Sequence, residues 1–196
     1  MLGFNEKGLS LVGSGIQQRE EAPSEIHPWL ICRIALESCS TVEEFTDFMD
    51  AIPRWAGGEN LCVADAHGHM ARLSYSTRRL SVTRTKDHFL VSTNHYHEPE
   101  LSRFGPTNKE YPSTYERYGR LVELLNENYG RVDVETTMKI MSDHERGDKP
   151  PEGDHSICRH GEIHQTFTNS IIRPTEGKLW ISKGPPCVRN YSTFVI

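Results

Sequence analysis

The sequence has no excess of positive charge and no long hydrophobic run. Its formal net charge is −5, and its lysines and arginines are scattered along the chain. Electrostatics therefore does not favour nucleic acid or an anionic membrane as a partner. No apolar stretch approaches the roughly 20 residues that cross a bilayer, and the N-terminus lacks the basic and then apolar pattern of a signal peptide. These absences predict a cytoplasmic protein that binds neither nucleic acid nor membrane.

Cysteine and apolar residues are also scarce. The five cysteines are widely spread and form no CxxC pair: Cys32, Cys39, Cys62, Cys158 and Cys187. An odd, dispersed set argues against an extracellular disulfide framework and favours a reducing compartment. The apolar fraction of 36% is low for a compact chain of 196 residues. It indicates a thin-layered fold, or a chain that lacks part of its core.

Helix and strand signals alternate in groups along the chain. One helix is expected around residues 29–36, and a second begins at the capping box Thr41-x-x-Glu44. The stretch 111–130 predicts a third helix, with Ser113 and Glu116 as another capping box, and Asp133 is expected to cap a fourth. Strands are expected near 9–12, 61–64 and 88–93 and in the tail of the chain. Grouped helices and strands predict a single α+β layered domain over residues 1–196.

The first candidate site is Thr93-Asn94-His95, at the end of the apolar stretch that predicts a strand. A side-chain amide carries two N–H donors, and such donors suit an oxyanion hole. The alternative is an asparagine that only begins a turn.

The second candidate is the segment DHSICRH, residues 154–160, in which Arg159 is flanked by polar residues and Cys158. A fixed guanidinium can bind a carboxylate or hold charge beside a nucleophile, whereas the alternative is a surface arginine in a polar loop. Cys158 is a better candidate for a reactive thiol than Cys62, which is expected in the core. A reactive thiol needs a neighbouring base or cation, which a sequence does not reveal.

Histidines form a third group of candidates. Ten are present, and seven of them form the pairs His67-x-His69 and His95-x-His97 and a run with Cys158 that comprises His155, His160 and His164. Spaced histidine and cysteine side chains are ligands for zinc, but the spacing of this run matches no closed zinc site. We therefore expect no metal site, and a histidine-rich metal-binding protein is the weakest reading of the chain.

The order of the short motifs is more specific than any one of them. GFNEKGLSLVG, LICRIALESCSTVEEF, ENLCVADAHG, FLVSTNHYH, TYERYGRLVELL, MSDHERG, HSICRHGEIHQTFTNSII and GPPCVRNYSTFVI follow one another nearly from end to end. This ordered set resembles the isopenicillin N acyltransferase-like (acyl-CoA:6-aminopenicillanic acid acyltransferase) family of N-terminal-nucleophile (Ntn) hydrolases. That family is distantly similar to the choloylglycine, or bile salt, hydrolases.

The resemblance implies a four-layer αββα sandwich and acyl transfer or amide hydrolysis through an acyl-enzyme. It implies that Asn94 contributes to the oxyanion hole and that Arg159 positions substrate or stabilises charge. Their neighbours His95 and Ser156 are assigned to substrate binding, whereas Asn60 and Asp65 are expected to be structural. No cofactor is expected. The partners are a small-molecule amide or acyl-CoA, the latter as a substrate.

Two departures from the family pattern affect the functional prediction. Gly15 occupies a position where the bile salt hydrolases have an asparagine. The family nucleophile, with the arginine and aspartate that accompany it, lies upstream of NEKGL, so Met1 is expected to be a cut edge. We expect that none of the five cysteines is the nucleophile and that the chain alone is inactive. A missing N-terminal segment or a separate chain would supply the nucleophile and the first strands. The alternative is an inactive remnant, or a binding module, with the same fold.

Overall fold

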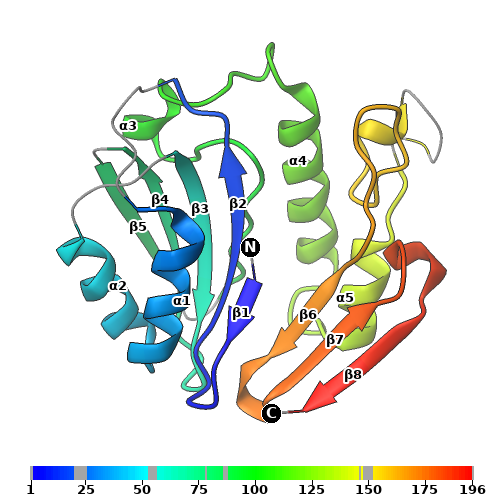
Figure 1. The fold of residues 1–196 in the computed structure, drawn as a ribbon. Helices are drawn as coiled ribbons and strands as arrows, with labels where there is room; N and C mark the ends of the chain where they lie inside the picture. The colour runs from blue at the N-terminus through cyan, green and yellow to red at the C-terminus, as the bar shows by residue number, and fades with distance from the viewer. Residues whose placement is uncertain are drawn as a thin grey trace. The chain divides into compact units, whose positions relative to one another are not determined.

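A computed structural model describes residues 2–19, 26–52, 57–77, 79–85, 88–145, 147 and 152–195. These residues form two compact units (Figure 1). Unit 1 comprises the described residues up to Glu110 together with Pro174–Gly177, and unit 2 comprises Tyr111–Arg173 and Lys178–Val195. Met1, whose status as a cut edge is a prediction, lies outside the described residues.

Unit 1 is built on a five-stranded antiparallel sheet whose strands follow in chain order. The strands are β1 (Leu2–Phe4), β2 (Ser10–Ile16), β3 (Gly58–Ala64), β4 (Met70–Ser76) and β5 (Arg79–Thr85). In the register, Leu11 pairs with Val63 and Leu61 pairs with Leu73. Because side chains alternate across a strand, these apolar residues share one face of the sheet.

Two helices cover that apolar face, α1 (Pro28–Ser38) and α2 (Val42–Ala51) (Figure 1). Helix α1 starts with Pro28 at its first position, and α2 is capped by Thr41, whose hydroxyl accepts the Glu44 N–H at 3.1 Å. The core between helices and sheet contains Leu9, Leu11, Ile31, Cys32, Ala35, Cys39, Val42, Phe45, Met49, Leu61, Val63, Ala71, Leu73 and Tyr75. Both expected helices and the Thr41 cap are confirmed.

The opposite face of the sheet, here called the polar face, carries Ser14, Asn60, Cys62, Arg72 and Ser74. Cys62 was expected in the apolar core, and this was wrong. It lies half-buried on the polar face, because alternation along β3 gives the core-facing positions to Leu61 and Val63. Unit 1 also contains the short helix α3 (Pro99–Ser102), which follows β5 in the sequence.

Unit 2 has a three-stranded antiparallel sheet, β6 (Ser170–Arg173), β7 (Lys178–Ser182) and β8 (Tyr191–Val195). Its helices are α4 (Pro112–Glu127) and α5 (Val134–Met141). It also contains the 3-10 helices η1 (Glu152–Asp154) and η3 (Pro186–Val188), whereas the 3-10 helix η2 (Pro174–Glu176) belongs to unit 1. Asp133 caps α5 as expected, accepting the Thr136 N–H at 2.7 Å. Among the described residues of unit 2, the buried apolar side chains are Ile140, Ile157, Cys158 and Pro186.

The capping box expected at Ser113 and Glu116 was wrong. Helix α4 already begins at Pro112, so Ser113 lies inside the first turn and not at the cap. The Ser113 hydroxyl instead donates to the Asp154 carbonyl at 2.7 Å, and the Glu116 carboxylate lies 3.1 Å from His155 Nδ1.

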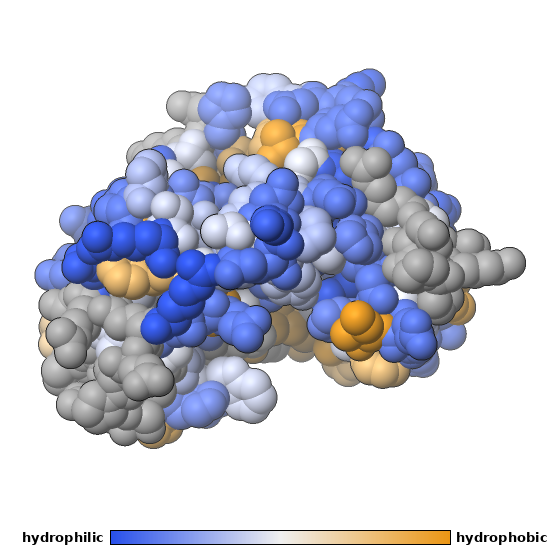
Figure 2. All heavy atoms as spheres, turned by 90° about the horizontal axis from the view of Figure 1, so that it is seen from above, coloured by the Kyte–Doolittle hydropathy of each residue, from blue (hydrophilic) through white to orange (hydrophobic). Residues whose placement is uncertain are grey.

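The described helices include none that is long and apolar enough to pass through a membrane. On the face shown in Figure 2, hydrophilic side chains predominate and hydrophobic ones form small separate patches.

Candidate active site

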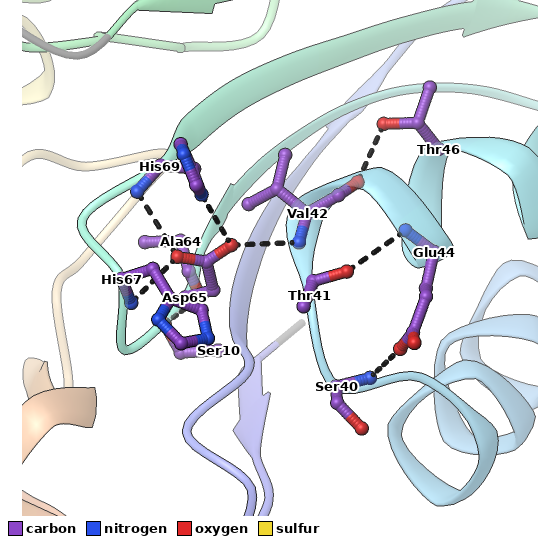
Figure 3. A network of polar contacts seen from close by, with 10 residues as sticks. All are labelled: Ser10, Ser40, Thr41, Val42, Glu44, Thr46, Ala64, Asp65, His67 and His69. Carbon is purple, nitrogen blue, oxygen red and sulfur yellow. Dashed lines mark hydrogen bonds and ion pairs between the residues drawn. The ribbon is translucent and has the colours of Figure 1, made fainter.

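A buried aspartate organises the turn that joins β3 to β4 (Figure 3). Asp65 accepts the backbone N–H groups of Val42, His67 and His69 at 3.1, 2.9 and 3.1 Å, and its Oδ2 lies 3.2 Å from His69 Nδ1. Burial alone would raise the pKa of Asp65, but these hydrogen bonds outweigh it and lower the pKa. Asp65 thus ties the turn to the N-terminus of α2, the structural role that the family resemblance implied.

The segment 88–94 crosses the polar face and pairs with no strand among the described residues. The strand expected at 88–93 was therefore wrong. Side chains provide hydrogen bonds that a neighbouring strand would otherwise provide. Asn60 Nδ2 donates to the carbonyls of Thr93 and His95 at 3.1 and 2.8 Å. Ser14 Oγ donates to the same Thr93 carbonyl at 2.8 Å, and the Cys62 thiol donates weakly to Ser92 Oγ at 3.5 Å. An apolar run can satisfy its backbone in this way as well as in a sheet.

A buried ion pair secures the end of this segment. Arg72 donates from Nε and Nη2 to Glu98 Oε1 at 3.1 and 2.8 Å, and from Nη1 to the Val91 carbonyl at 3.0 Å. Arg72 and Glu98 are 8% and 7% exposed, so the pair lies away from water. Arg72 therefore binds Val91 and Glu98, which lie before and after Asn94 in the sequence.

Asn94 is half-buried, and its Nδ2 donates to the carbonyl of Gly15 at 2.8 Å. This bond uses one N–H of the amide and fixes the orientation of the group. A fixed donor on a braced segment is the kind of group that stabilises a developing oxyanion without reorganising. The role of Asn94 stays a prediction, and the geometry is compatible with it.

Gly15, where the resemblance implies an asparagine in the bile salt hydrolases, is not required by packing. A Cβ added at Gly15 would meet no atom within 4 Å, and Gly15 does not have a positive φ. We expect Gly15→Ala to raise the free energy of unfolding by about 0.5–1 kcal/mol, because it restricts the unfolded chain. Denaturant unfolding measures this change. Gly58→Ala is the control that should destabilise, since its Cβ would collide with the buried Tyr96 hydroxyl.

Two of the predicted binding residues have internal contacts. His95 is buried, and its Nδ1 lies 3.1 Å from Thr93 Oγ1. Ser156, in unit 2, is also buried and donates from Oγ to the Gly147 carbonyl at 2.7 Å. These bonds help to order the two segments, and direct contact of either residue with substrate stays a prediction.

Arg159 lies in unit 2 beside a second arginine. Its backbone pairs with Thr166, through Arg159 N to Thr166 Oγ1 at 2.9 Å and Thr166 N to the Arg159 carbonyl at 2.8 Å. Burial and then the positive charge of Arg159 lower the pKa of Arg117 to about 10. Arg159 Nη1 is buried and has no hydrogen-bond partner among the described residues. Two neighbouring cations with a buried donor form a local environment suited to an anionic group.

The cysteines with resolved shifts have thiols that resist ionisation. Burial raises the pKa of Cys32 to about 12 and that of Cys158 to about 11, and it also raises the pKa of Cys39 and Cys62. A thiol must ionise to act as a nucleophile, so these four environments disfavour that role.

The histidine run of residues 155–164 does not come together as one cluster. His155 pairs with Glu116, and His164 Nδ1 lies 3.5 Å from Asp154 Oδ1. Cys158 and His160 instead meet His144 and Cys187, with all four ligand atoms within 4.8 Å of one another. The sequence reasoning did not group these four residues, because they come from three separate segments.

Comparison with known proteins identifies the family. Residues 1–186 match the family described as acyl-coenzyme A:6-aminopenicillanic acid acyl-transferase. Among curated protein sequences no match is found.

Two solved structures share the fold. One is penicillin V acylase from Agrobacterium tumefaciens, with a TM-score of 0.60 and 16% identity over 93% of this chain. The other is a single-substitution variant, arginine to leucine, of conjugated bile acid hydrolase from Clostridium perfringens, with a TM-score of 0.56 and 13% identity over 93% of this chain. The chain spans 62% of the first protein and 69% of the second. The predicted α+β Ntn-hydrolase fold is thereby confirmed, and the chain belongs to the acyl-coenzyme A:6-aminopenicillanic acid acyl-transferase family.

Proposed function

We propose that the chain is the oxyanion-stabilising and charge-positioning part of an acyltransferase or amide hydrolase. The nucleophile is an N-terminal cysteine on a segment other than this chain, a missing N-terminal segment or a separate chain. The observation that carries the proposal is the braced position of Asn94, whose amide is fixed by Gly15 on a segment held by Ser14, Asn60 and Arg72. The raised pKa of the Cys158 thiol supports a nucleophile from elsewhere.

In the proposed reaction, the cysteine thiol loses its proton to its own α-amino group and attacks the carbonyl carbon of an amide or a thioester. The carbonyl oxygen becomes an oxyanion, which accepts a hydrogen bond from Asn94 Nδ2. Collapse of the intermediate breaks the bond to the amine or thiol, which leaves with a proton, and forms the acyl-enzyme. Water or an acceptor amine then takes the acyl group, and the thiol is regenerated. Arg159 holds an anionic group of the substrate.

The decisive variant is Asn94→Ala in a preparation that contains both the chain and the nucleophile-bearing segment. We expect kcat to fall by about a hundredfold or more, or ~3 kcal/mol of barrier, because the oxyanion loses a preorganised donor. Steady-state kinetics with penicillin V, a conjugated bile acid and an acyl-CoA with 6-aminopenicillanic acid measures this. Asn126→Ala on α4, which is remote in sequence from this motif, is the matched control and should leave kcat unchanged. An unchanged kcat for Asn94→Ala would remove Asn94 from the oxyanion hole.

Activity assays of the chain alone distinguish the proposal from its alternatives. We expect the purified 196-residue chain to release no product from any of these substrates. Turnover by the chain alone that Cys158→Ser abolishes would place the nucleophile within this chain and overturn the proposal. Binding of these ligands without turnover, even with the nucleophile-bearing segment present, would instead identify a binding module with the same fold.

A further inference from the structure

Two histidines and two cysteines of unit 2 converge on one point. His144 follows α5, Cys158 and His160 lie on the segment after η1, and Cys187 lies in η3 between β7 and β8. Their ligand atoms, one from each side chain, all lie within 4.8 Å of one another. His160 Nε2 lies 3.4 Å from the sulfur of Cys158 and 3.4 Å from that of Cys187. One imidazole nitrogen thus lies between two sulfurs.

These separations suit a tetrahedral metal ion. With Zn–S bonds of about 2.3 Å and Zn–N bonds of about 2.0–2.1 Å, neighbouring ligand atoms in a tetrahedron are roughly 3.3–3.8 Å apart. The two sulfur–nitrogen distances of 3.4 Å fall in this range. The other pairs of ligand atoms are at most 4.8 Å apart, and small rotations of the side chains would bring them within the tetrahedral range.

The donor set selects the kind of metal. Two sulfurs and two imidazole nitrogens are borderline-soft ligands that favour Zn²⁺ over Mg²⁺ or Ca²⁺, which prefer oxygen. Four protein ligands leave no open position for water or substrate, as in structural zinc sites. A disulfide between Cys158 and Cys187 is the competing chemistry, but it would leave the two imidazoles beside it without a role.

The backbone that carries the ligands is tied together by hydrogen bonds next to the ligands. Cys158 N–H donates to the carbonyl of Asp143, the neighbour of His144, at 3.1 Å. Ser142 Oγ donates to the carbonyl of Pro186, the neighbour of Cys187, at 2.9 Å. Arg120 of α4 donates to Asp143 Oδ2 from Nη2 at 2.9 Å. The three ligand-bearing segments are therefore held in place by contacts other than the ligands themselves.

Unit 2 has a small apolar core, which a metal cross-link would help to stabilise. Its described residues include few buried apolar side chains, namely Ile140, Ile157, Cys158 and Pro186, and both apolar core clusters lie in unit 1. Small units with little apolar core are commonly stabilised by a disulfide or a structural metal. An ion at this point would join the end of α5 to the segment after η1 and to the β7–β8 connection.

We propose that unit 2 binds one Zn²⁺ through His144, Cys158, His160 and Cys187 in a closed structural site. The proposal departs from the expectation, drawn from sequence spacing, of no metal site. Binding replaces the thiol protons of Cys158 and Cys187, which are released to solvent, and both sulfurs coordinate as thiolates while both imidazoles coordinate in the neutral form. The metal takes no part in the proposed acyl transfer, although Arg159, which is proposed to hold substrate, lies between the ligands Cys158 and His160 in the sequence.

The test uses the full chain without a histidine tag, reduced, stripped with a chelator and titrated with Zn²⁺ or Co²⁺. We expect equimolar uptake, with the visible bands of tetrahedral Co²⁺ and a thiolate-to-cobalt charge-transfer band. Cys158→Ser and Cys187→Ser should each weaken binding by more than about a hundredfold, since even residues that only orient metal ligands contribute 10–100-fold. The matched controls Cys62→Ser and His155→Ala should bind as the parent chain does.

A second measurement uses the unsubstituted chain, so it does not depend on how the variants fold. Alkylation followed by peptide mass spectrometry should show that Zn²⁺ protects Cys187, which is half-buried, and leaves the reactivity of Cys62 unchanged. Sub-stoichiometric uptake by the reduced chain, equal uptake by ligand variants and controls, or alkylation unaffected by Zn²⁺ would each overturn the proposal. A Cys158–Cys187 disulfide together with no metal uptake after its reduction would assign the pair to redox chemistry instead.

Discussion

Arg72→Ala should lower the free energy of unfolding by about 3–5 kcal/mol, because it leaves the carboxylate of Glu98 buried without its cation. The variant removes both bonds to Glu98 Oε1 and the bond to the Val91 carbonyl. The segment 88–98 has no strand ladder of its own, so it loses a principal tie to the sheet. Denaturant unfolding followed by circular dichroism gives the change in free energy.

The control for Arg72→Ala is Arg84→Ala, an exposed arginine on β5 of the same sheet. It should change the free energy of unfolding by no more than about 0.5 kcal/mol. The double variant Arg72→Met, Glu98→Leu should recover most of the loss, since it removes both buried charges. A loss for Arg72→Ala as small as that of Arg84→Ala would mean that the ion pair does not hold the segment.

Asp65→Ala should lower the free energy of unfolding by a similar amount, about 3–5 kcal/mol, because it leaves several amide donors without an acceptor. Those donors are the N–H groups of Val42, His67 and His69, and Asp65 is only 2% exposed (Figure 3). Thermal or denaturant unfolding checks the value. Asp47→Ala, an exposed aspartate of α2, is the matched control and should be close to neutral.

The pH dependence of the Asp65 contribution has a definite sign. The pKa of Asp65 is lowered in the folded chain, so the unfolded chain binds the proton more readily. The stabilisation is complete above the unfolded pKa of about 3.9 and is lost as the pH falls through the folded pKa. The parent chain should therefore lose its advantage over Asp65→Asn on acidification below about pH 4. A difference between the two that stays constant with pH would show that the Asp65 carboxylate is not held in its charged form.

Local signals predicted the helices of unit 1 well. Thr41 caps α2 because its hydroxyl reaches the Glu44 N–H, a contact within one turn that depends on few other residues. In the reciprocal bond expected of a capping box, Glu44 Oε2 instead accepts the N–H of Ser40, one residue before the cap, at 2.6 Å. The order of motifs predicted the family, since several weak matches in a fixed order are specific together.

Non-local contacts account for what the sequence did not predict. The run at residues 88–93 looks like a strand, yet the carbonyls of Val91 and Thr93 accept hydrogen bonds from the side chains of Ser14, Asn60 and Arg72. No pattern within residues 88–93 predicts that the side chains of Ser14, Asn60 and Arg72 will contact this segment. The grouping of Cys158 and His160 with Cys187 is of the same kind. Spacing along one segment pointed to His155 and His164, which instead pair with Glu116 and Asp154.

The two-sided sheet of unit 1 separates the positions that fill the apolar core from those that do not. Along β3 the core-facing Leu61 and Val63 alternate with Asn60 and Cys62 of the polar face. A combinatorial library confined to polar-face positions other than Ser14, Asn60, Cys62 and Arg72, which hold the segment 88–98, would leave the apolar core unchanged, so most of its members should fold. Random mutagenesis of the same strands would lose more of its members, because substitutions that fall on the core face leave cavities or overpack. The alternation of the pleat is thus a guide for laboratory evolution of this chain.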